Sequence, residues 1–119
     1  MGEQSMLDRQ EAFAGKHRRQ LATFLRRWQG GKARLWAFHA SHCSLTIRIE
    51  SATKPGNLHI VCLGPEHIHG PVAWENCCFE IVDNMRADGE EGYLLRDEAA
   101  GFAVRTEEIE VAENCQPLS

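Results

Sequence analysis

The chain lacks a long hydrophobic run. None of its 119 residues falls in a window that approaches the roughly 18 apolar residues of a membrane-spanning helix. The first apolar pair, Met6 and Leu7, is too short for the core of an export signal. We therefore expect a protein with neither a membrane span nor an export signal, located in the cytoplasm.

The common catalytic and nucleotide-binding motifs are also missing. The chain has no nucleophile elbow, no Walker loop, no dinucleotide fingerprint and no zinc-finger spacing. Its five cysteines are an odd number, which favours reduced thiols over a disulfide framework. Cys77 and Cys78 would point to opposite faces of a strand and are poor partners for each other. The sequence thus identifies no catalytic residue and favours a protein without catalytic activity.

Charge and reactive side chains are unevenly distributed along the chain. Seven Lys and Arg and no acid lie between Lys16 and Arg34, whereas twelve acids and three Arg lie from Glu75 to the end. Five of the six His and four of the five Cys lie between them, from His39 to Cys78. The net charge of −4 argues mildly against a nucleic-acid binder that uses its whole surface. The length predicts one domain over residues 1–119.

Residues 5–30 have the periodicity of one amphipathic helix. Its apolar side chains fall on one side of the helical wheel: Phe13, Leu21, Phe24, Leu25 and Trp28. His17 lies on this stripe, where we expect a packed imidazole with one hydrogen bond. Gly30 and Gly31 predict the end of the helix.

A strand periodicity replaces the helical one after Gly31. We expect a β-rich part over residues 33–112 and a frayed tail over 113–119. The predicted strands cover 33–40, 43–50, 58–63, 77–82, 93–97 and 102–106, with a bulge or break at 106–108. Alternation places Cys43 on the buried face with Leu45 and Ile47. The predicted class is α+β: an N-terminal amphipathic helix packed on a curved antiparallel sheet, or on a small open β-barrel, of about six strands.

The segment 64–71 is the strongest candidate for a metal site. Two Gly-Pro pairs predict an irregular loop, and in extended chain His67 and His69 project to one side. Two neutral imidazoles at this spacing can share a Zn²⁺, with Glu66, Glu75, Cys62 or Cys77 as a third ligand. The alternative is a surface loop with two solvated imidazoles, and no cofactor is expected in that case.

Other histidines favour structural roles. A turn at 40–41 would bring His39 and His42 together. His59 is the polar position of an otherwise apolar strand, where we expect a half-buried imidazole that a neighbour hydrogen-bonds.

The basic side of the helix allows three interpretations. It could contact nucleic acid, lie on an anionic membrane surface, or face solvent or a protein partner while the apolar stripe packs on the sheet. We favour the third, because the helix alone is not stable in water and the sheet needs a cover. The candidate partner-binding residues are Arg18, Arg19, Arg26, Arg27, Lys32, Arg34 and Trp74. Trp74 follows Gly70-Pro71 as an aromatic of the type enriched at binding hot spots, although it could equally be a core anchor.

These observations predict a small cytoplasmic interaction module without catalytic activity. Its partner would be another protein or a second copy of the chain, since the acidic half complements the basic helix. The first alternative is a zinc-type metal-binding domain or metal-dependent enzyme that uses His67 and His69. The second alternative is a nucleic-acid-binding protein that uses the basic helix.

Overall fold

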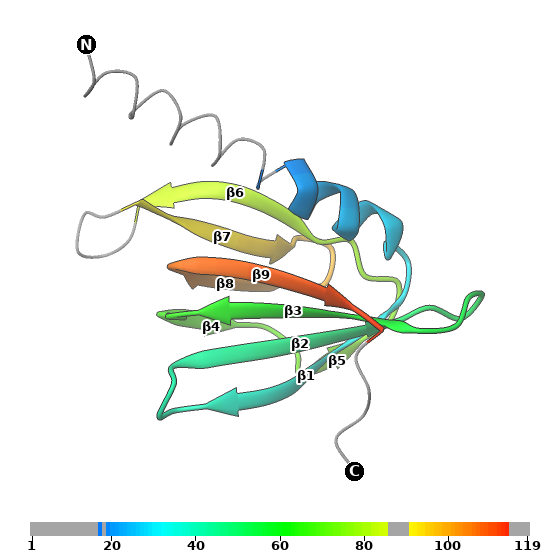
Figure 1. The fold of residues 1–119 in the computed structure, drawn as a ribbon, viewed down its shortest axis with the longest axis horizontal. Helices are drawn as coiled ribbons and strands as arrows, with labels where there is room; N and C mark the ends of the chain where they lie inside the picture. The colour runs from blue at the N-terminus through cyan, green and yellow to red at the C-terminus, as the bar shows by residue number, and fades with distance from the viewer. Residues whose placement is uncertain (1–16, 18, 86–90, 115–119) are drawn as a thin grey trace.

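The protein folds into two antiparallel β-sheets and one helix, an α+β arrangement (Figure 1). The structure, a computed structural model, describes residues 17, 19–85 and 91–114. The strands are β1 (Lys32–His39), β2 (Ser44–Glu50), β3 (Asn57–Leu63), β4 (His67–His69), β5 (Ala73–Trp74), β6 (Glu80–Met85), β7 (Glu91–Asp97), β8 (Phe102–Thr106) and β9 (Glu108–Glu113). The helix covers residues 19–27, and His17 is helical too.

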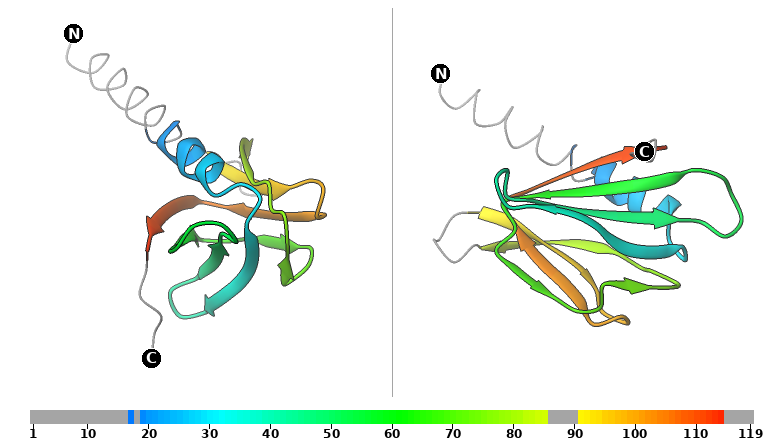
Figure 2. Two further views of the ribbon diagram at one scale, coloured as in Figure 1. Left: turned by 90° about the vertical axis from the view of Figure 1, so that its right-hand side faces the viewer. Right: turned by 90° about the horizontal axis from the view of Figure 1, so that it is seen from below.

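The strands form a five-stranded sheet of order β5-β1-β2-β3-β9 and a four-stranded sheet of order β4-β8-β7-β6. All neighbouring strands are antiparallel. Figure 2 shows the two sheets as separate layers that do not close into one barrel. The prediction of an antiparallel α+β domain is therefore confirmed at the level of class, whereas the arrangement is two sheets in place of one.

The core lies between the two sheets and follows the period-2 alternation of their strands. Every second residue of β2, β3 and β9 points inward, and the four-stranded sheet supplies the facing side chains. The most deeply buried core residues are Ile47, Ile49, Leu58, Ile60, Cys62, Leu95, Phe102, Val104 and Ile109. Full burial of each aliphatic side chain contributes about 1.5–3 kcal/mol before entropy is counted.

The helix covers the side of the molecule where β9 and β6, the outermost strands of their sheets, are not paired with each other (Figures 1 and 2). Leu21, Leu25 and Trp28 are buried there, as the apolar stripe predicts. The His17 ring nitrogen Nε2 lies 3.1 Å from the carbonyl oxygen of Ile109 in β9, which confirms the packed, hydrogen-bonded imidazole.

The exit from the helix is tied to the segment before β6. The Gly30 amide donates to the Cys77 carbonyl at 2.7 Å, and the Cys77 amide donates to the Gly31 carbonyl at 2.9 Å. A side chain at Gly31 would lie 2.6 Å from the carbonyl oxygen of Glu50, so only glycine allows this approach to β2. The predicted stop at these glycines is confirmed, because residues 28–30 form a turn directly after the helix.

Several boundaries differ from the sequence-based expectation. The predicted helix spans 5–30, but the structure places a helix at 19–27 and a turn at 28–30, and Phe13 with the rest of 5–16 lies outside the described residues. The segment 64–71 holds the short strand β4 and is not wholly irregular, and β6 begins at Glu80 and not at Cys77. Cys43 is not on the buried face: it is exposed, and its φ of 45° places it in the turn before β2.

Two local predictions in the second half are confirmed. The predicted strands 93–97 and 102–106 are present, and they pair as a hairpin in which Tyr93 lies opposite Thr106 and Asp97 opposite Phe102. The chain breaks at Glu107, as the slip of apolar parity predicts, and β8 and β9 belong to different sheets. Within the described residues, no helix is long and apolar enough to cross a membrane.

We expect the Leu25→Ala variant to lose about 2–5 kcal/mol of unfolding free energy, because it empties a buried site under the helix. The neighbouring Arg26→Ala variant is the matched control; this side chain is exposed and its loss should cost no more than about 0.5 kcal/mol. Urea unfolding of both variants measures the difference. Equal stability of the two would contradict a helix that covers the core.

Candidate interaction surface

The basic residues predicted to meet a partner are mostly exposed. Arg19 and Arg26 lie on the solvent side of the helix, and Lys32 and Arg34 project from β1. None of these four forms an ion pair with a residue that the structure describes. We call them the basic surface. Arg18 lies outside the described residues.

Arg27 differs from the other helix cations. Its guanidinium forms an ion pair with Glu113 of β9 and lies 5.2 Å from the centre of the Phe24 ring. Glu113 also accepts a hydrogen bond from the Trp28 indole at 3.2 Å. Arg27 therefore attaches the helix to β9, and we leave it out of the basic surface.

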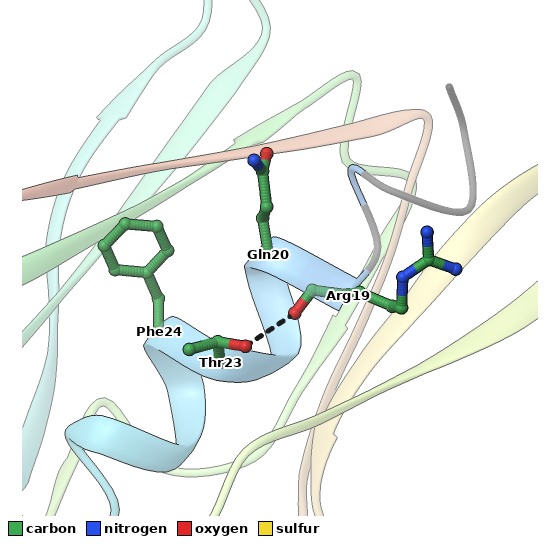
Figure 3. Close-up of a pocket in the computed structure, with 4 residues that line it drawn as sticks. All are labelled: Arg19, Gln20, Thr23 and Phe24. Atoms are coloured by element: carbon green, nitrogen blue, oxygen red, sulfur yellow. Dashed lines mark hydrogen bonds between the residues drawn. The ribbon is translucent and has the colours of Figure 1, made fainter. Parts of the chain in front are cut away.

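The helix also bears an open hollow of about 370 Å³. Its lining residues are Arg19, Gln20, Thr23 and Phe24 (Figure 3). The Thr23 hydroxyl donates to the Arg19 carbonyl at 2.9 Å, so this side chain is engaged with its own helix. The hollow is shallow and belongs to the same exposed region as Arg19, which makes it part of a contact surface and not an enclosed ligand site.

The predicted metal ligands are exposed but dispersed. His67 and His69 lie two residues apart in β4, where they pair with Arg105 and Ala103 of β8. Both side chains face solvent. Glu75 follows β5 in the other sheet and is also exposed. The described part of the chain contains no group of three or more His, Cys, Asp or Glu that could hold a metal ion. His67, His69, Glu66 and Glu75 therefore do not form an assembled ligand group among these residues, and the zinc hypothesis stays a prediction.

The remaining reactive side chains are held apart. The rings of His39 and His42 lie 6.5 Å apart, which confirms the predicted turn between them. Cys77 is buried and Cys78 is exposed, although both precede β6 and neither lies in a strand. Burial raises the pKa of the Cys62 thiol to about 12 and that of Cys77 to about 11, so neither supplies thiolate at neutral pH.

Trp74 interacts with its own chain. Its indole nitrogen donates to Asp97 at 2.8 Å, and its ring packs 4.8 Å from Phe102 and 5.5 Å from Phe79, measured between ring centres. The buried Asp97 also accepts hydrogen bonds from the backbone amides of Cys78 and Ala100. These contacts favour the core-anchor interpretation of Trp74, and we leave it out of the proposed binding surface.

The outer face of the five-stranded sheet, turned away from the four-stranded sheet, holds a cluster that sequence reasoning missed. Trp36 is the extra residue of a bulge in β1, where the register shifts between Leu35 and Ala37. The guanidinium of Arg48 lies 4.6 Å from the centre of the Trp36 ring. Arg48 donates to Glu50 at 2.7 Å, and its Nη1 lies 3.3 Å from the His59 Nε2.

This cluster keeps a large charged side chain flat against the sheet. The Arg48 side chain is only 11% exposed, although it lies on an outer face, because Trp36 covers it. Burial lowers the pKa of His59, and the positive charge of Arg48 lowers it further. A neutral His59 can accept the Arg48 hydrogen bond, which confirms the predicted half-buried imidazole. The alternation around Ile47 predicts that Arg48 points outward. No sequence pattern predicts the bulge that brings Trp36 over Arg48.

Comparison with known proteins gives no relative for this arrangement. No protein-family model, no curated protein sequence and no solved structure shows a significant match to the chain. The functional argument therefore rests on the surfaces described above.

We expect Asp97→Ala to lower the unfolding free energy by about 2–4 kcal/mol, because the Trp74 indole and the Cys78 amide lose a buried acceptor. The control is Glu98→Ala, which removes an exposed carboxylate that, among the residues the structure describes, pairs only with Arg96 at 3.3 Å; it should cost about 0.5 kcal/mol or less. Urea unfolding followed by tryptophan fluorescence measures both. Similar losses in the two variants would show that Asp97 does not organise this region.

The lowered pKa of His59 makes stability depend on pH. The unfolded chain binds this proton more readily than the folded one, so the unfolding free energy should fall as the pH drops below about 6.5. His59→Gln keeps an acceptor for Arg48 and cannot titrate; its stability should fall less between neutral and mildly acidic pH. The exposed His42→Gln is the control and should keep the wild-type pH dependence. An unchanged slope in His59→Gln would rule out this linkage.

Proposed function

We propose that this chain is a non-catalytic interaction module that binds an acidic protein surface through its basic surface. The observation that carries the proposal is the contrast among its cations. Arg27, Arg48 and Arg96 pair with carboxylates of the same chain. The residues of the basic surface are exposed and, among the described residues, have no such partner.

Unpaired exposed cations are suited to an anionic partner for a physical reason. Their own chain has an excess of acids, with a net charge of −4, yet no carboxylate of the described residues forms an ion pair with these cations. A partner that brings carboxylates to Arg19 and Arg26 gains Coulomb attraction without breaking an existing ion pair. Such attraction mainly speeds association and selects the partner, and salt weakens it.

Two further features support binding over catalysis. The thiols of Cys62 and Cys77 are buried and protonated, whereas the His residues of β4 lie on a short exposed strand. Apolar side chains are exposed at Ile68 and Val72, which are 44% and 70% exposed, next to the link between β4 and β5. This segment can add apolar contact to a partner interface.

Selection from a random peptide display library, with the immobilised full-length chain as bait, tests the proposal. We expect the enriched peptides to be rich in Asp and Glu. Their affinity should weaken with added salt, and by about 2- to 30-fold in the Arg19→Gln/Arg26→Gln variant, since each lost ion pair costs about 0.2–1 kcal/mol.

The matched control is Ser41→Glu/Ala52→Glu, which changes the net charge by the same amount at exposed turn positions. It should bind the selected peptides nearly as the wild type does. Peptides without acids, or equal binding by both variants, would contradict the proposal. Stronger binding of single-stranded oligonucleotides than of the acidic peptides would assign the basic surface to nucleic acid instead.

A further inference from the structure

The outer face of the five-stranded sheet carries opposite charges along its two sides. Lys32 and Arg34 project from β1, and Glu108 and Glu110 project from β9. All four are exposed, and none forms an ion pair with another residue of the described chain. β2 and β3 lie between them, so about three strand spacings, roughly 14 Å, separate the cations from the carboxylates. The two charged sides are therefore too far apart to neutralise each other within one molecule.

The centre of this face is compatible with close contact. Thr46 of β2 pairs with Val61 of β3, and both are half-buried. The central charges, Arg48 and Glu50, already pair with each other. Trp36 remains 37% exposed above Arg48. In Figure 1 this face is turned toward the viewer, and no described segment crosses it.

We propose that this face binds the same face of a second copy of the chain, which forms a two-fold symmetric dimer. The inference rests on the proposed function in one respect. It takes a second copy of the chain as the acidic partner of Lys32 and Arg34, whereas the helix cations of the basic surface bind another protein. Two-fold dimers are the commonest symmetric assemblies, and their interfaces must be self-complementary. A face that is positive on one side and negative on the other meets that requirement.

The charges also select the orientation of the dimer. The registers place Arg34 level with Ala112 and Glu110 level with Ala37, so the cations and the carboxylates occupy diagonally opposite corners of the face. A two-fold axis that lies between the two faces, diagonal to the strands and perpendicular to the line that joins these corners, places the cations of each copy over the carboxylates of its partner twice. Thr46, near the centre of the face, then lies close to Thr46 of the second copy. A two-fold axis along the strands would place Arg34 over Ala112 and away from Glu110, so it would not bring the opposite charges together. The strands of the two sheets would cross at a steep angle, as in an orthogonal sandwich, with the sheets about 10 Å apart.

The size of the face sets the expected strength. Four strands of six to eight residues give a footprint of roughly 450 Å². A stable interface of standard size buries about 800 Å² on each partner, so this dimer should be weak and reversible. Because charge pairs contribute much of the attraction, we expect the dissociation constant to rise at least about tenfold between about 20 and about 300 mM NaCl.

Sedimentation equilibrium of the full-length chain tests the dimer with two charge-reversal variants. Lys32→Glu/Arg34→Glu and Glu108→Lys/Glu110→Lys each place like charges at both contacts, and each alone should be monomeric. An equimolar mixture of the two variants restores opposite charges at both contacts and should form a heterodimer. Recovery in the mixture also shows that both variants are folded. A wild-type chain that stays monomeric at low salt and at about 200 µM overturns the inference, as does a mixture that stays monomeric.

A second variant and a control complete the test. Thr46→Arg adds a cation near the proposed axis and should also give a monomer. Arg19→Gln/Arg26→Gln should remain dimeric while it loses the acidic peptides, so failure of the dimer and failure of the proposed function are separate results. Dimers in Thr46→Arg and in both charge-reversal variants alone would place the interface elsewhere. The last outcome concerns nucleic acid. If a single-stranded oligonucleotide quenches the tryptophan fluorescence of a monomeric wild-type chain but not that of Trp36→Ala, the face binds nucleic acid and the inference is overturned.

Discussion

The contact between the helix and the open side of the two sheets is the constraint on which the rest of the structure depends. β9 and β6 end their sheets without pairing to each other, which would leave part of the core in water. Leu21, Leu25 and Trp28 bury their side chains at this opening. The dependence is mutual, because a helix of this length is not stable alone in water. The turn after Trp28 then fixes where β1 begins, and β1 carries both the Trp36 bulge and two of the unpaired cations.

The sequence predicts those features that arise from local periodicity. The helical stripe around Leu21 and Leu25 and the strand alternation around Ile47 each define one apolar side, and in the fold that side is buried. The break at Glu107 is predictable for the same reason, since a slip in parity must end the pairing or bend the strand. The assignment of strands to two sheets is not predictable in this way, because the periodicity of a strand does not say which neighbour it pairs with.

The features that were missed depend on single backbone deviations. One extra residue in β1 moves Trp36 over Arg48, and a positive φ turns Cys43 out of the alternation that would bury it. Neither is visible as a pattern, because each concerns one residue. Trp74 shows a different limit: the same aromatic in a loop can bind a partner or its own chain. The buried carboxylate of Asp97, 23 residues away in sequence, favours the second.

Charge segregation along the chain becomes charge segregation in space through the order of the strands. β1 continues the basic segment directly after the helix, and β9 belongs to the acidic second half. If β1 and β9 were neighbours in the sheet, cross-strand pairs such as Arg34 with Glu110 would neutralise both within one molecule. The order β1-β2-β3-β9 prevents this, because β2 and β3 hold the two charged strands apart on one face. Both sets of charges then remain exposed on one face, and this topological separation is the physical basis of the binding role that we propose.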